Sequence, residues 1–137
     1  MITPLTGNEM NFYDLLLPEN PGTVVMDGKE YAWNTWGEIL NPPTDAQVWA
    51  TYKNEFYEGS PAVTFRKLGK GTITYVGVDS HNGALEKDIL KKLYAQLNIP
   101  VMDLPYGVTM EYRNGLGIVL NYSDQPCLLY TSPSPRD

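Results

Sequence analysis

Short runs in which apolar and polar residues alternate, separated by glycine, proline and asparagine, fill the first half of the chain. Such alternation is typical of β-strands that bury one face. It predicts strands over residues 23–26 and 29–40, joined by a tight turn at Asp27-Gly28, and a further strand over residues 46–52. Residues 1–22 are rich in Pro, Asn and Gly and are expected to form a loop, with room for one helical turn.

The middle of the chain carries a strand hairpin followed by a helix. Residues 62–68 and 72–78 flank Gly69-Lys70-Gly71, which predicts a three-residue glycine hairpin whose second strand is apolar enough to be buried. We expect the helix to begin at Asn82 as its N-cap and to end before Pro100. Its apolar stripe consists of Leu85, Ile89, Leu93 and Leu97. A buried strand followed by an amphipathic helix favours an α/β layered fold.

A second hairpin near the end of the chain indicates a separate domain. The runs 108–112 and 116–122 flank an Asn-Gly turn at residues 113–115, and no helical pattern follows them. We therefore expect a small β-domain that begins near residues 102–105. The expected division of the chain is 1–102, 103–126 and 127–137.

Residues 127–137 differ in character from the rest of the chain. They read Cys-Leu-Leu-Tyr-Thr-Ser-Pro-Ser-Pro-Arg-Asp, and one back-translation of this run matches a transposase sequencing adapter over its whole length. We therefore expect an adapter-derived tail and exclude it from the fold. A natural disordered Ser/Pro tail is the alternative. With the adapter interpretation, the native sequence stops near Pro126.

Charge and residue counts exclude several classes of function. The formal net charge of -6 argues against nucleic-acid and anionic-membrane partners, because binding phosphates needs clustered Lys and Arg. A single cysteine, Cys127, rules out an internal disulfide, and a single histidine, His81, removes the two-His zinc sites. No stretch approaches the roughly 20 apolar residues of a membrane helix. We expect no metal and no other cofactor.

The polar residues after the 72–78 run offer one candidate ligand site. Open α/β sheets bind ligands at the carboxyl ends of their strands, which makes Asp79 and His81 candidates for ligand or acid/base roles. The favoured alternative is a strand-to-helix turn whose polar residues cap the helix. Adjacent Asp79, Ser80 and His81 cannot form a catalytic triad, since nucleophile and base must converge from separate elements.

The aromatic residues of the first half are a second candidate site. The set consists of Trp33, Trp36, Trp49, Tyr52, Phe56 and Tyr57. Its three Trp rings are weak candidates for stacking on a sugar, because aromatic rings give large rigid contact areas. Packing in the core or in a subunit interface is the favoured explanation, since the same residue types are enriched there.

The acidic residues offer no catalytic pair. A retaining glycosidase needs two carboxyl groups about 5 to 5.5 Å apart, and nothing in the sequence brings two glutamates together. The glutamates considered are Glu38, Glu55, Glu58, Glu86 and Glu111. We assign no catalytic residue.

Three stretches of the chain form an ordered set of motifs. Residues 48–64 are a strand that leads to Phe-Tyr-Glu-Gly-Ser-Pro-Ala-Val-Thr, residues 65–77 are the glycine hairpin with its second strand, and residues 107–123 end in Leu-Asn-Tyr-Ser. In order and spacing these motifs resemble the glycoside hydrolase family 42 β-galactosidases, with their "FYxGxPAVT" segment and "LNYS" strand. With residues 36–42, the resemblance covers most of residues 22–126.

The resemblance implies a modular enzyme with an N-terminal (β/α)8 barrel, a middle amidotransferase-like, flavodoxin-like α/β domain that builds a trimer, and a small C-terminal β-domain. Residues 1–102 would then belong to the second half of the trimerisation domain, and residues 103–126 would begin the last domain. The family's catalytic glutamates and its β-galactoside site belong to the barrel, and no position here matches them. The implied role is a non-catalytic oligomerisation segment of a retaining enzyme that hydrolyses terminal β-D-galactosides, with the homotrimer as its assembly and the cytoplasm as its favoured location.

The middle domain of this family is related in fold to the class I glutamine amidotransferases. Amidotransferase activity is nevertheless excluded by the residues of this chain. Residues 77–81 are similar to the Gly-x-Gln-x-His strand end of those enzymes, but Asn82-Gly83 replaces the expected Pro-Glu and the required cysteine is missing. Two other hypotheses stay open. One is a sugar-binding accessory module that uses surface aromatics, and the other is a small hydrolase that uses Asp79 and His81.

Overall fold

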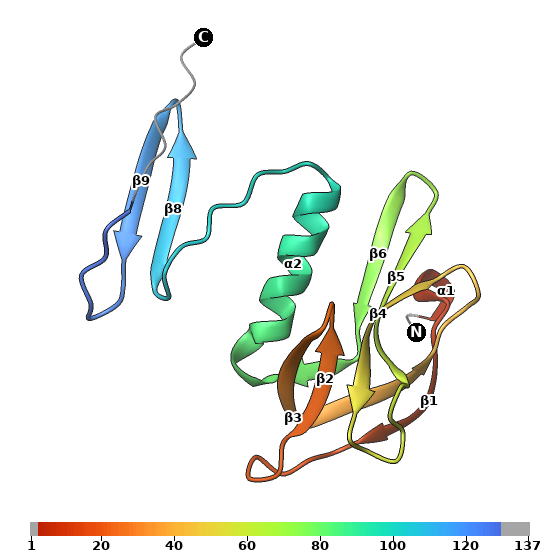
Figure 1. Ribbon diagram of the computed structural model, residues 1–137. Coiled ribbons are helices and arrows are strands. Elements are labelled where there is room, and N and C mark those ends of the chain that lie inside the picture. Colours follow the sequence, from red (N-terminus) through yellow and green to blue (C-terminus); the bar gives the residue numbers. More distant parts are fainter. Residues whose placement is uncertain (1–2, 130–137) are drawn as a thin grey trace.

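The computed structural model describes residues 3–129 and shows a curved antiparallel sheet, a helix that packs on it and a hairpin outside it (Figure 1). The elements are α1 (Thr3–Thr6), β1 (Glu9–Asp14), β2 (Gly22–Met26), β3 (Lys29–Asn41), β4 (Gln47–Lys53), β5 (Pro61–Leu68), β6 (Gly71–Val76), β7 (Val78–Ser80), the 3-10 turn η1 (His81–Gly83), α2 (Ala84–Gln96), β8 (Val108–Arg113) and β9 (Leu116–Asn121). The strands expected over residues 23–26, 29–40 and 46–52 are confirmed as β2, β3 and β4.

The seven-stranded sheet curls until it nearly closes on itself. Its strands follow the order β1-β3-β2-β4-β5-β6, and β7 pairs with β3. The segment formed by β6 and β7 is interrupted only at Gly77, which bonds to both neighbouring strands. The Gly77 N–H donates to the Ala62 carbonyl of β5 at 2.9 Å, and the Gly77 carbonyl accepts from the Glu38 N–H of β3 at 2.6 Å. The curvature therefore encloses a core within one sheet.

The predicted α/β, flavodoxin-like layered fold is wrong. That fold needs parallel strands with helices on both faces. Here every paired strand is antiparallel, and α2 is the one long helix among the described residues, so the domain is β-sandwich-like. The difference arises because one strand followed by one helix is a local pattern that α/β and mainly antiparallel folds share.

The tight turns follow their sequence signals closely. Asp27-Gly28 and Asn114-Gly115 both have positive φ angles, as a type I′ turn requires, so both hairpins are confirmed. The glycine hairpin is shorter than predicted, because Gly71 already pairs within β6 and leaves a two-residue loop, Gly69-Lys70. Strand β6 is also less buried than predicted, since it is the last strand in the pairing order and its apolar residues are half-buried.

Aromatic side chains make up much of the core inside the curved sheet. Trp33 of β3 is fully buried and meets Tyr52 of β4 edge-on, with 5.5 Å between ring centroids. The Tyr52 hydroxyl donates a hydrogen bond to the Glu38 carbonyl at 2.9 Å, which ties β4 to β3 across the interior. Trp49 and Phe65 stack with centroids 4.6 Å apart. The core therefore combines ring packing with a satisfied buried hydroxyl.

Helix α2 closes the core, and Ser80 organises its start. The Ser80 hydroxyl accepts a hydrogen bond from the Leu85 N–H at 3.1 Å, and the Glu86 carboxylate accepts one from the Ser80 N–H at 3.1 Å. The prediction of Asn82 as N-cap is wrong, because Asn82 lies within η1 at a φ of 58°. The predicted stripe fails at its last member, since the helix ends at Gln96 and Leu97 is 60% exposed.

The expectation of a loop over residues 1–22 is wrong at residues 9–14, which form β1, whereas the helical turn expected there does form as α1; residues 1 and 2 lie outside the described residues. Strand β1 pairs antiparallel with β3, from Glu9 opposite Asn41 to Asp14 opposite Gly37, with a bulge between Met10 and Phe12. β1 lies at the end of the pairing order, so one of its edges is left without a strand neighbour among the described residues.

Strands β8 and β9 form a two-stranded sheet of their own, joined to α2 by an extended segment (Figure 1). Every residue of β9 is exposed, and Val108 is the one buried residue of β8. The main sheet domain, by which we mean β1–β7 with α2, thus stands apart from the terminal hairpin, β8–β9. The expected domain boundary near residue 102 stays a prediction.

Candidate functional site

The five ligand candidates from the sequence do not gather in one place. Trp33 and Trp49 are buried in the core of the main sheet domain. Trp36 and Asp79 line one shallow hollow of about 330 Å³ between β3, the β6–β7 segment and α2. His81 lies exposed in η1. The structure therefore brings together two of the five residues, and their ligand roles stay predictions.

The two glutamates that line this hollow are engaged by hydrogen bonds from the protein. Glu38 accepts a hydrogen bond from the Trp36 indole N–H at 3.2 Å and another from the Tyr75 hydroxyl. Burial and the hydrogen bond to Glu38 raise the pKa of Tyr75 to about 12. Glu86 is bonded to both the hydroxyl and the N–H of Ser80. These contacts give both carboxylates a structural role, because Glu38 joins β3 to β6 and Glu86 joins α2 to β7.

The described part of the chain was searched for groups of metal-binding side chains and for helices that could span a membrane. Across residues 3–129, no three His, Cys, Asp or Glu side chains are grouped so that they could hold a metal ion. Over the same residues, no helix has the length and apolarity needed to cross a membrane. Three apolar surfaces remain as candidates for a functional role.

The first apolar surface follows edge strand β1, and we call it the aromatic edge. Phe12 and Tyr13 are successive strand residues, so their side chains leave opposite faces of β1. Phe12 stacks on Phe56 of the β4–β5 loop, with centroids 5.7 Å apart and an interplanar angle of 8°. Tyr13 stacks on Trp36 of β3 at 4.7 Å and 11°. Phe56 is 86% exposed and Tyr13 52% exposed, so the ring pairs lie at the surface.

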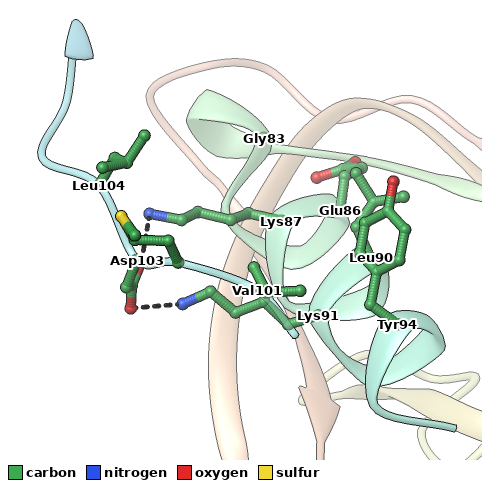
Figure 2. A pocket seen from close by; sticks show the side chains of 10 residues that line it. Gly83, Glu86, Lys87, Leu90, Lys91, Tyr94, Val101, Asp103 and Leu104 are labelled. Atoms are coloured by element: carbon green, nitrogen blue, oxygen red, sulfur yellow. Dashed lines mark hydrogen bonds and ion pairs between the residues drawn. The ribbon is translucent and has the colours of Figure 1, made fainter. Parts of the chain in front are cut away.

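The second surface is a groove on the outer side of α2, which Figure 2 shows, and we call it the helix groove. Its volume is about 460 Å³, and it is lined by Gly83, Glu86, Lys87, Leu90, Lys91, Tyr94, Val101, Met102, Asp103 and Leu104. Lys87 and Lys91 reach from the helix toward Asp103, with N–O distances of 3.5 Å and 2.8 Å. These exposed ion pairs link Asp103 to the helix and give the groove a charged rim.

The third surface is the terminal hairpin itself. Its two strands expose large apolar side chains at Tyr112, Leu116, Ile118, Val119 and Leu120. Because neighbouring strand residues point to opposite faces, both faces of this hairpin are apolar. A two-stranded hairpin with two apolar faces needs a further layer to be stable in water.

Comparison with known proteins gives the family context of these surfaces. The family model described as "Beta-galactosidase trimerisation domain" matches residues 1–105. Beta-galactosidase LacA of Lactobacillus acidophilus is 38% identical over 73 residues, which are 53% of this chain and 11% of that protein. Beta-galactosidase BgaB of a Geobacillus species is 31% identical over 100 residues, which are 69% of this chain and 15% of that protein.

Solved structures agree in the same region. The polyextremophilic β-galactosidase of the Antarctic haloarchaeon Halorubrum lacusprofundi superimposes with a TM-score of 0.76 at 28% identity, covering 88% of this chain and 18% of that one. The cold-adapted β-galactosidase of Rahnella sp. R3 gives a TM-score of 0.69 at 28% identity, covering 80% and 17%. The chain therefore spans less than a fifth of the length of the relatives it matches.

Proposed function

The chain belongs to the family of β-galactosidase trimerisation domains, and we propose that it is a segment through which a glycoside hydrolase family 42 β-galactosidase assembles into a homotrimer. The observation that carries this proposal is the match of the trimerisation-domain model to residues 1–105, which include the whole main sheet domain. The segment is non-catalytic.

The catalytic work of the parent enzyme would lie outside this chain. We infer that the parent hydrolyses terminal β-D-galactosides with two carboxyl groups that belong to a barrel domain, which also binds the substrate. In support, the relatives are β-galactosidases of which this chain spans less than a fifth. Neither Glu38 nor Glu86 offers a free carboxylate, because protein donors already engage both. No nucleic-acid or membrane partner is part of this proposal.

The terminal hairpin would begin the next domain of the parent. Its apolar residues are exposed on both faces, as expected for the first two strands of a larger β-domain. The hairpin starts at Val108, just beyond the last residue matched by the family model. These observations support our proposal that the boundary between the two domains lies near residues 102–105, along the segment that follows α2.

An assembly role fits the surface of the main sheet domain. A cyclic trimer uses heterologous contacts, in which one surface of each copy meets a different surface of the next. The main sheet domain carries the aromatic edge and one wall of the helix groove, which lie on different elements. Clustered exposed apolar side chains of this kind are typical of interaction sites.

Sedimentation equilibrium of the 137-residue chain, combined with calorimetric titration of β-galactosides, tests the proposed function. We expect the average mass to rise with concentration toward that of three chains, and we expect no heat of galactoside binding. A chain that stays monomeric up to high micromolar concentration would contradict the assembly role. Saturable binding of a galactoside to the chain would show instead that this segment takes part in substrate recognition.

A further inference from the structure

We propose that residues 99–107, which we call the hinge segment, allow the terminal hairpin to close over the helix groove. The closing surface is the face of β8 that carries Met110 and Tyr112, and it packs on Leu90 and Tyr94 of α2 in the closed state. This inference concerns the join between the two regions of the chain and does not rest on the proposed assembly.

Both walls of the helix groove are apolar and only half covered. Leu90 and Tyr94 on the helix wall are 53% and 41% exposed, and Val101 and Met102 on the opposite wall are each 47% exposed. Figure 2 shows the hinge segment running along α2, with Asp103 facing the helix. A continuous apolar surface of this kind is typical of one that another part of the protein covers.

The terminal hairpin already forms part of this apolar surface. A second hollow, of about 380 Å³, shares lining residues with the groove, among them Tyr94 and Met102. Its remaining wall includes Met110 and Tyr112 of β8. Because the same face of the hairpin lies at the end of the groove, the hairpin is the segment of the chain that is placed to cover it.

A glycine makes this face of the hairpin suitable for packing. Gly117 of β9 lies opposite Tyr112, and a Cβ at Gly117 would lie 2.9 Å from Cε of Met110 and 3.3 Å from the Tyr112 ring. Since glycine has no side chain, Met110 and Tyr112 lie over this strand and form one apolar face. Tyr112 is 66% exposed, so much of its ring is available for a further contact.

Residues 100–104 are the part of the hinge segment that can bend. At the start of the segment, the Ile99 N–H donates to the Tyr94 carbonyl at 2.9 Å, which fixes it to α2. At its end, the Gly107 carbonyl accepts from the Tyr122 N–H at 2.7 Å, which fixes it to the hairpin. Among the described residues, no backbone hydrogen bond ties residues 100–104 to a helix or strand. The hairpin can therefore turn as a unit about these residues.

The charges at the rim of the groove do not oppose closure. Lys87 and Lys91 pair with Asp103 at the surface, and exposed ion pairs of this kind contribute little to stability. Lysine side chains can also keep their ammonium groups in water while their methylene stems cover an apolar surface. Closure leaves the strands of both regions paired, so the hairpin opens and closes without unfolding of the main sheet domain.

Disulfide trapping tests the closure in the 137-residue chain, in a background where Cys127→Ser removes the single native cysteine. The test variant combines Leu90→Cys with Met110→Cys. The matched control combines Leu90→Cys with Glu111→Cys, which lies on the opposite face of β8. A disulfide needs Cα atoms within about 7 Å of each other, so it forms only when the two sites meet. We expect the intrachain disulfide to form at least tenfold faster in the test variant, and equal rates would overturn the inference.

Two further measurements do not depend on that comparison. In the unmodified chain, we expect nuclear Overhauser cross-peaks between the Leu90 methyl protons and the Tyr112 ring protons, and their absence would contradict closure. Adding Met102→Asp to the test variant places a charge in the groove and should slow disulfide formation at least fivefold. An unchanged rate would show that the hairpin does not pack in the groove. None of these results depends on the number of copies in the assembly, so their failure would leave the proposed function standing.

Discussion

The β2–β3 and β8–β9 hairpins share the same type of turn and strand pairing, but the first is largely buried and the second is largely exposed. Each turns through an Asx-Gly pair with positive φ angles, and each pairs its strands in regular antiparallel register. Yet β2 buries Val24 and Met26 and β3 buries Trp33, whereas every residue of β9 is exposed. A turn sequence thus decides that a hairpin forms, and the neighbouring elements decide what it buries.

The two hairpins differ in the strands and helix that surround them. β2 and β3 lie within a sheet that continues through β4 and β1 and is covered by α2, so their apolar faces meet a core. Within residues 3–129, β8 and β9 have only each other as strand neighbours. Isolated two-stranded hairpins are marginal in water, so most of the stability of the chain should come from the main sheet domain. Matched substitutions in the two regions test this difference.

The largest difference is expected for the same leucine truncation in the two regions. Leu85→Ala removes a fully buried side chain of α2 and should lower the free energy of unfolding by about 3 to 5 kcal/mol. Leu120→Ala removes a side chain that is 45% exposed on β9 and should change it by less than about 0.5 kcal/mol. Urea unfolding followed by far-UV circular dichroism measures both. Equal losses would show that the hairpin is part of the same cooperative unit.

A smaller difference is expected for two serine substitutions. Ser80→Ala removes the acceptor of the Leu85 N–H and the donor to Glu86 at the start of α2, and should cost about 2 kcal/mol. Ser123→Ala removes a hydroxyl whose hydrogen bonds to Asn121 and Gln125 lie at the surface, and should cost a few tenths of a kcal/mol in the same urea unfolding experiment. If Ser80→Ala were as mild as Ser123→Ala, the account of how α2 begins would be wrong.

The two Asx-Gly turns allow a third comparison with identical chemistry. Gly28 and Gly115 have φ angles of 80° and 78°, and a Cβ at either position would meet no atom within 4 Å. Alanine at either site therefore adds backbone strain alone, about 1 kcal/mol. For Gly28→Ala this strain should appear in the global free energy of unfolding. For Gly115→Ala it should appear only as faster hydrogen exchange within β8 and β9, and a global loss from that change would contradict the separation of the two regions.

The smallest effect is a pH dependence that belongs to the main sheet domain. The folded pKa of Tyr75 is raised from 10.0 to about 12 by burial and by its hydrogen bond to Glu38. Because folding favours the protonated phenol, this contribution to stability is complete below pH 10 and is lost as the pH rises toward 12. Tyr75→Phe should flatten the decline of stability between pH 10 and 11. A decline of the same steepness in this variant would assign the effect to other groups.

Sequence patterns predicted the elements that depend on neighbours along the chain. The Asp27-Gly28 and Asn114-Gly115 turns, the strands beside them and the position of α2 all follow from local signals of turn residues and periodicity. The family could also be predicted from the sequence. The order and spacing of the motifs over residues 48–64, 65–77 and 107–123 are together specific for it.

The features that the sequence did not reveal depend on contacts between distant residues. Closure of the sheet rests on Gly77 bonding to Ala62 and Glu38, which no local pattern encodes. In β4, strict alternation would place Trp49 and Ala50 on opposite faces, but irregular pairing with β5 allows both to be buried. Because the sequence does not reveal that the sheet closes, the succession of one strand and one helix suggested an α/β layered fold.

The aromatic edge was missed for a similar reason. Phe12 and Tyr13 lie in a segment whose Pro, Asn and Gly content suggested a loop, although the alternation of Met10 and Phe12 was an available strand signal. Trp36 and Phe56 were recognised as aromatic candidates, but their partners on β1 emerge only from the pairing of β1 with β3. Surface roles of this kind depend on tertiary structure, which brings together residues from three separate segments.

Native mass spectrometry of the 137-residue chain over a range of micromolar concentrations tests the central claim most directly, because it counts the copies in each assembly. The account predicts that a discrete species of three copies grows with concentration at the expense of single chains. Single chains at every concentration, or an open-ended series of sizes without a preferred number of copies, would contradict the assignment of this chain to assembly of the enzyme.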